Sequence, residues 1–115
     1  MKVLFDQGVP VPLRRHLHPH DVDTSAERRW STLQNGELLN EAESAGYEAF
    51  VTTDRNLKYQ QKLAGRRIRI LVLTTTAWPR ISKQTARIRD ELEALVSGGY
   101  VEVDVQPPET ARQSE

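Results

Sequence analysis

The sequence predicts a three-layer α/β domain with a mainly parallel sheet of about five strands and about four helices. Short β-prone segments alternate with helical segments along the chain, which is the pattern of strand-helix-strand units. The segment at 68–73 is almost uniformly apolar, as expected when helices cover both faces of a sheet. A length of 115 residues suits one domain, which we assign to residues 1–105.

The first strand and helix are marked by composition and by proline. Residues 2–5, K-V-L-F, are β-prone, and the loop after them is rich in glycine and proline. Pro12 suits the first turn of a helix in which Leu13 and Leu17 share one face. Pro19 then ends this short helix.

A second strand is expected at 20–24, followed by an irregular connection at 25–34. Asn35 is a candidate N-cap for the next helix, and Gly46 occupies the position of a C′ glycine. The apolar face of this helix combines Leu38, Leu39, Ala42 and Ala45.

The third strand is predicted at 49–53, where apolar and β-branched residues cluster. Asp54 or Asn56 can cap a helix that Gly65 ends, and the apolar strand at 68–73 follows.

The last helix is predicted from a helical repeat and is closed by the glycine pair at 98–99. At 101–105 valines alternate with acids, which predicts a half-exposed edge strand. We expect residues 106–115 to form a disordered tail. The repeat consists of Ile81, Thr85, Ile88, Leu92 and Leu95.

Composition narrows the classes of function. Sixteen basic residues balance sixteen acidic ones, so a nucleic-acid surface would have to be a local patch. The lack of cysteine excludes disulfides, thiolate metal sites and cysteine nucleophiles. The apolar runs are too short for a membrane span, and M-K-V-L-F-D is unlike a signal peptide. We therefore expect a cytoplasmic protein with no membrane partner.

Acidic residues stand at the ends of predicted strands. If the strands are parallel, Asp6 and Asp54 lie on the same rim of the sheet, where ligands bind in such folds. Glu37, in the first turn of the helix near Asn35, projects to that side, and Asp23 could join it. Carboxylates gathered in this way repel one another, and Mg²⁺ or Mn²⁺ would relieve the repulsion.

Each acid alone also has an ordinary structural role. Asp54 can be a helix N-cap, Asp6 a turn residue, and Glu37 a first-turn glutamate favoured by the helix dipole. The prediction of a site therefore depends on the acids converging.

Three segments, M-K-V-L-F-D-Q-G-V-P, S-T-L-Q-N-G-E-L-L and F-V-T-T-D-R-N-L-K-Y-Q-Q-K-L-A-G-R, resemble an uncharacterised bacterial family of PIN-like proteins. The resemblance covers residues 1 to about 105 and implies a PIN-like domain with a central parallel sheet. It also implies a Mg²⁺- or Mn²⁺-dependent ribonuclease related to the VapC-like toxins of toxin–antitoxin pairs. The expected partners are RNA, an antitoxin protein and a second copy in a homodimer.

The resemblance implies that Asp6, Glu37 and Asp54 are catalytic and hold the metal. Arg55 and Asn56 stand where the PIN pattern has a further acid, and Asn56 offers a neutral oxygen ligand instead. The candidate RNA contacts are Arg14, Arg28, Arg29, Trp30 and Arg55.

Two other functions remain open. A phospho-receiver module would use Asp6, Asp54 and Thr74, but it needs an acid where Gln7 stands and a lysine after the fifth strand, and no lysine follows Lys83. A catalytically silent PIN-like scaffold for a protein partner would need no complete set of acids.

Overall fold

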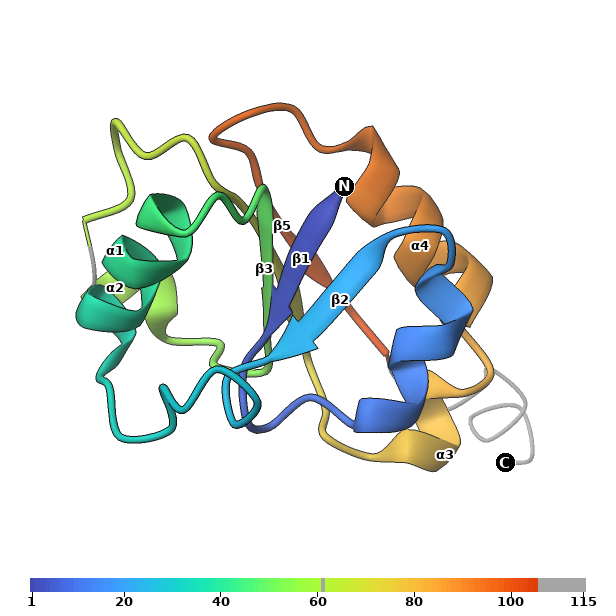
Figure 1. Cartoon of the computed structure of the whole chain (residues 1–115). Coiled ribbons are helices and arrows are strands. Elements are labelled where there is room, and N and C mark those ends of the chain that lie inside the picture. Colours follow the sequence, from blue (N-terminus) through green and yellow to red (C-terminus); the bar gives the residue numbers. More distant parts are fainter. Residues whose placement is uncertain (61, 106–115) are drawn as a thin grey trace.

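The computed structural model describes residues 1–60 and 62–105 and confirms the predicted fold class (Figure 1). Its five strands form one sheet in the order β2-β1-β3-β4-β5, and every neighbouring pair is parallel. The predicted disordered tail, 106–115, lies outside the described residues. The strands are β1 (Lys2–Phe5), β2 (Asp21–Thr24), β3 (Ala49–Thr52), β4 (Arg69–Leu73) and β5 (Tyr100–Val103).

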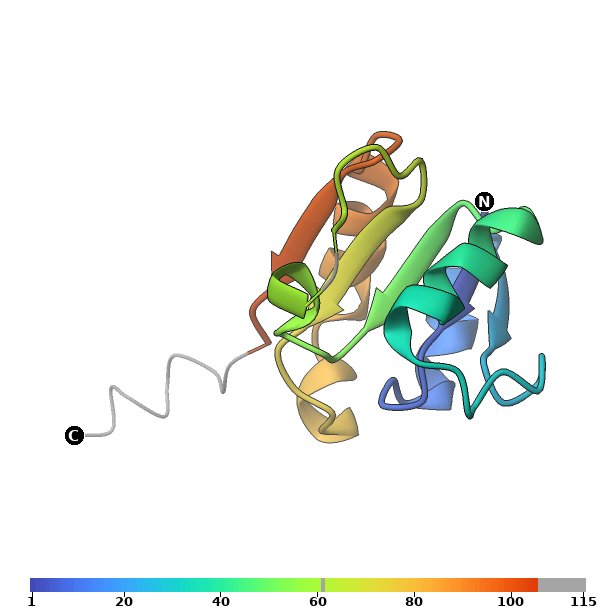
Figure 2. The ribbon, with the colours of Figure 1, turned by 90° about the vertical axis from the view of Figure 1, so that its left-hand side faces the viewer.

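Helices cover both faces of the sheet, with η1, α3 and α4 on one face and α1 and α2 on the other (Figures 1 and 2). Successive strand residues point to opposite faces of the sheet. Val3 and Phe5 pack toward η1 and α4, whereas Leu4 packs toward α1. The helices are η1 (Val11–Leu17, a 3₁₀ helix), α1 (Asn35–Ser44), α2 (Leu57–Gln60), α3 (Trp78–Ile81) and α4 (Thr85–Ala94).

The connections on the β5 side of the sheet have opposite hands. The chain moves in the same direction from β3 to β4 and from β4 to β5, yet α2 lies on one face and α4 on the other. One of the two crossovers is therefore left-handed, against the strong preference of parallel strands. As a result α4 packs beside η1, and on the opposite face the helix beside β5 is, within residues 1–60 and 62–105, the short α2.

Several predicted boundaries were wrong. The last helix, predicted from Ile81 onward, begins as α4 only at Thr85. Ile81 instead ends α3, which has Pro79 in its first turn, and residues 82–84 separate the two helices. The helix expected up to Gly65 covers only Leu57–Gln60 among the described residues. Asn35 is the first residue of α1, and the N-cap is Gln34.

The structure confirms Gly46 as the residue that follows α1 with a positive φ. No helix in the described part of the chain has the length and the apolar character needed to cross a membrane.

Two glycines with positive φ allow a matched test of backbone strain. Gly46→Ala should lower the free energy of unfolding by roughly 1 kcal/mol, because an L side chain is unfavourable in the left-handed region. Gly98→Ala should lower it further, since its Cβ would also lie 2.9 Å from the carbonyl oxygen of Arg66. Urea denaturation of both variants measures the difference, and equal losses would contradict this explanation.

Candidate functional site

Asp6 and Asp54 lie on the carboxyl rim of the sheet, after the neighbouring strands β1 and β3. The buried hydroxyl of Thr52, the last residue of β3, donates a hydrogen bond to Asp6 Oδ2 at 2.8 Å. The same hydroxyl oxygen accepts the backbone N–H of Asp54 at 3.1 Å. One threonine hydroxyl thus joins the two acidic residues.

Each of these carboxylates is held by further donors. The Asn35 side chain donates to Asp54 Oδ2 at 2.7 Å, and the Asn56 N–H donates to Oδ1 at 3.0 Å. The Gln7 N–H donates to Asp6 Oδ1 at 2.9 Å. Each carboxylate oxygen therefore accepts one hydrogen bond and retains acceptor capacity for another partner.

Glu37 has a different role in this conformation. It forms a capping box with Gln34, whose N–H donates to Glu37 Oε1 at 3.3 Å, and it is exposed. Within residues 1–60 and 62–105, no three side chains of histidine, aspartate or glutamate gather in the manner of a metal site. The contact of α1 with Asp54 is made by Asn35, and Asn56 supplies its backbone N–H.

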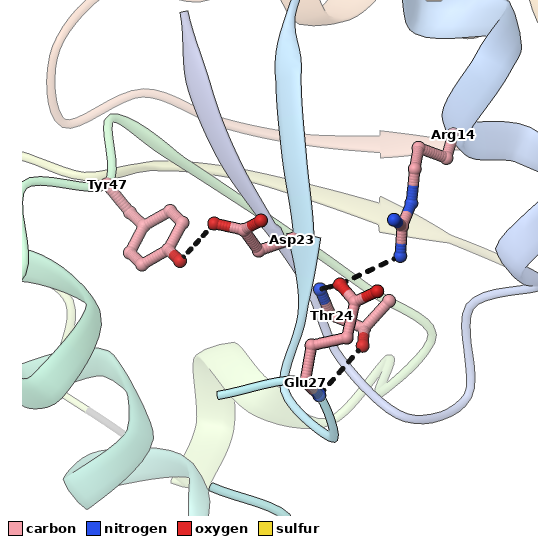
Figure 3. A network of polar contacts seen from close by, with 5 residues as sticks. All are labelled: Arg14, Asp23, Thr24, Glu27 and Tyr47. Atoms are coloured by element: carbon pink, nitrogen blue, oxygen red, sulfur yellow. Dashed lines mark hydrogen bonds and ion pairs between the residues drawn. The ribbon is translucent and has the colours of Figure 1, made fainter. Parts of the chain in front are cut away.

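Asp23 does not join Asp6. Its carboxylate accepts a hydrogen bond from the Tyr47 hydroxyl at 2.5 Å, as Figure 3 shows. Figure 3 also shows Arg14 reaching Glu27, with 2.9 Å between Nη2 and Oε1. The Thr24 N–H and the Arg14 guanidinium both donate to Glu27, and these bonds lower the pKa of its carboxyl group.

The other candidate RNA contacts differ in how free they are. The Arg28 guanidinium lies 4.6 Å from the centroid of the Trp30 ring, and Trp30 packs edge-on against Tyr47. Arg29 has a positive φ and is exposed, as is Arg55. Arg14 and Trp30 are therefore partly buried in contacts within the protein, and Arg28 is exposed but lies over the Trp30 ring. Arg29 and Arg55 are exposed, and Arg55 directly follows Asp54.

Ser25 is a feature that the sequence interpretation missed. Its N–H donates to the carbonyl oxygen of Phe5 at 2.9 Å, so Ser25 extends β2 beside Asp6. The residue is 1% exposed, and within the described part of the chain its hydroxyl has no hydrogen-bond partner. A buried hydroxyl of this kind calls for a water molecule or a ligand group. The serine stands in an irregular segment that offered no pattern to indicate it.

The Tyr47–Asp23 contact predicts an alkaline loss of stability. Burial and then the hydrogen bond to Asp23 raise the pKa of Tyr47 from 10.0 to about 12. Because the unfolded chain ionises first, this contribution is complete below about pH 10 and is lost as the pH rises toward 12.

Urea denaturation between about pH 9 and about pH 12 should show this decline, and the Tyr47→Phe variant should show a shallower one. Part of the decline should remain in that variant, because burial raises the pKa of Tyr100 to about 12 as well. Tyr59→Phe, which alters an exposed tyrosine, is the matched control and should keep the part of the decline that depends on Tyr47. A Tyr47→Phe profile parallel to that of the wild type would contradict the assignment.

Comparison of the chain with protein-family models, with curated proteins and with solved structures found no match. What stands is a small α/β domain with a five-stranded, all-parallel sheet and an acidic carboxyl rim.

Proposed function

We propose that the chain is a metal-dependent ribonuclease of PIN-like type, with Asp6 and Asp54 as its metal-binding carboxylates. The observation that carries the proposal is the Thr52 hydroxyl, which joins the two acidic residues after adjacent parallel strands. In such sheets the rim beyond the carboxyl ends is the place where ligands bind.

The chemistry of these donors fits Mg²⁺ or Mn²⁺. Mg²⁺ is commonly bound by one or two carboxylates, with water and substrate phosphate completing its coordination. Asp6 and Asp54 offer two carboxylates with acceptor capacity remaining, and the chain contains no thiolate to favour a softer metal. A bound ion would supply the charge that activates water and stabilises negative charge on a phosphate.

The surrounding residues position these carboxylates. Thr52 holds Asp6 toward β3, and Asn35 fixes the orientation of Asp54 from α1. Glu37 could bind the metal only by leaving its capping interaction with Gln34. We therefore do not count it among the metal-binding residues. The buried Ser25 hydroxyl, beside Asp6 along β2, would be an additional polar group for a water or phosphate.

Two alternatives have one supporting observation each. The strand order is that of the doubly wound class that includes phospho-receivers, but the Thr74 hydroxyl donates to Asp104, and Gln7 stands where a receiver needs an acid. A protein-binding scaffold is favoured by the engagement of Glu37 in its cap. Both alternatives predict no metal-dependent cleavage.

The proposal predicts that Asp6→Asn and Asp54→Asn abolish cleavage of single-stranded and structured RNAs in Mg²⁺ or Mn²⁺. Asp90→Asn is the matched control, since it removes an exposed carboxylate on α4, and it should leave cleavage unchanged. Cleavage that survives in both rim variants would overturn the proposal. Wild-type protein that neither cleaves RNA nor binds metal would favour the scaffold, and labelling of Asp54 by acetyl phosphate would favour the receiver.

Thr52→Val tests the bridging hydroxyl separately, because valine has a similar shape but its side chain cannot form hydrogen bonds. We expect metal affinity, measured by calorimetry, to fall by about 10- to 100-fold, as is typical when a group that orients a metal ligand is removed. Unchanged metal affinity in a folded Thr52→Val protein would show that the hydroxyl does not position Asp6.

A further inference from the structure

A hollow lies beside Asp54 on the side of β5. Its volume is about 410 Å³, and Tyr59 on α2 is 78% exposed at its edge. This residue is one of the few large hydrophobic or aromatic side chains that the described chain exposes. The lining residues are Arg55, Asn56, Lys58, Tyr59 and Glu102.

The hollow is a consequence of the change in hand between the last two crossovers. Because α4 packs on the face of η1, the helix beside β5 on its other face is the short α2 in the described part of the chain (Figure 2). Tyr100 and Glu102 are therefore only partly buried, and Lys58 approaches both from α2. A full helix at this position would fill the space.

The side chains around the hollow combine positive charge with an aromatic surface. The Lys58 ammonium lies 5.2 Å from the centroid of the Tyr59 ring and 5.8 Å from that of Tyr100. It also forms an ion pair with Glu102 at 3.5 Å, so one acid partly offsets the cations. Arg55 adds a second, exposed cation. In a chain with balanced charge, this is a local patch of the kind that a nucleic acid requires.

The patch is continuous with the acidic rim. Asp54 directly precedes Arg55. The N–H of Asp54 donates to the hydroxyl of Thr52, which in turn donates to Asp6. Burial and the nearby Glu102 raise the pKa of Tyr100 to about 12, and the charges of Tyr59 and Asp54 add to this effect. Glu102 beside the hollow and Asp54 on the rim thus both act electrostatically on the Tyr100 ring.

We infer that this hollow binds single-stranded nucleic acid, with a base stacked on Tyr59 and the backbone contacting Arg55 and Lys58. Only an unpaired base can stack on a protruding aromatic ring, so we expect the bound nucleic acid to be single-stranded. A strand bound in this hollow would pass Asp54. Whether this strand is the substrate of the enzyme rests on the proposed function. Binding itself does not depend on cleavage.

Fluorescence anisotropy in the presence of EDTA tests binding without cleavage, using a labelled single-stranded RNA and the DNA of the same sequence. Tyr59→Ala should weaken binding by about tenfold or more, whereas Tyr59→Phe should bind as the wild type does, because the ring is kept. Arg67→Gln, which alters an exposed arginine at the opposite end of the sheet, is the control and should have no effect.

The double variant Arg55→Gln, Lys58→Gln should also reduce the dependence of binding on salt, by a slope of about 0.7 for each phosphate that is no longer neutralised. Wild-type affinity in Tyr59→Ala, or equal affinity for duplex RNA, would overturn the inference. Tighter binding of RNA than of DNA would support an RNA substrate. Equal binding would support a site that contacts bases and phosphates but does not recognise the 2′-hydroxyl of RNA.

The outcomes separate this inference from the proposed nuclease. If Asp6→Asn binds RNA normally and neither it nor the wild type cleaves, the binding site stands and the nuclease proposal fails. If the wild type cleaves RNA but Tyr59→Ala binds and cleaves as well as the wild type, the nuclease proposal stands and the hollow is not its substrate site.

Discussion

The candidate site exists because β1 and β3 pair in parallel with one particular register. Phe5 pairs with Val51, so Asp6 and Thr52 come next to each other as the two strands end. The hydroxyl of Thr52 is buried at this point and binds both Asp6 and the backbone of Asp54. Because the strands are packed on both faces by helices, neither acid can shift along its strand without moving a core residue.

The hand of the last crossover shapes the surface next to this rim. By placing α4 beside η1, it buries Ile88 and Leu92 on one face and leaves Tyr100 and Glu102 of β5 only partly covered on the other. The exposed Tyr59 and the cations Arg55 and Lys58 occupy that uncovered side. The acidic rim thus follows from the parallel pairing of β1 and β3, and the hollow beside it follows from where the helices lie.

The parts of the site that could be predicted are those tied to strand ends. Asp6 directly follows an apolar segment, and Asp54 follows another after two threonines, so their common rim could be inferred by assuming parallel strands. The position of Glu37 could not be predicted in the same way, because a first-turn glutamate can reach a ligand or cap its own helix. Here the N–H of Gln34 is its partner. Likewise, the sequence does not distinguish an Asn35 that caps the helix from one that donates a hydrogen bond to Asp54, as it does here.

Local sequence patterns were sufficient for the alternation of strands and helices, the apolar faces of η1, α1 and α4, and the acids at the strand ends, because these follow from periodicity and from glycine and proline. Three other features became visible only in the folded chain: the division between α3 and α4, the side of the sheet on which α4 packs, and the unpartnered hydroxyl of Ser25 within the described residues. They arise from contacts between segments far apart in the chain, such as α4 with η1, and a local pattern carries no record of such contacts.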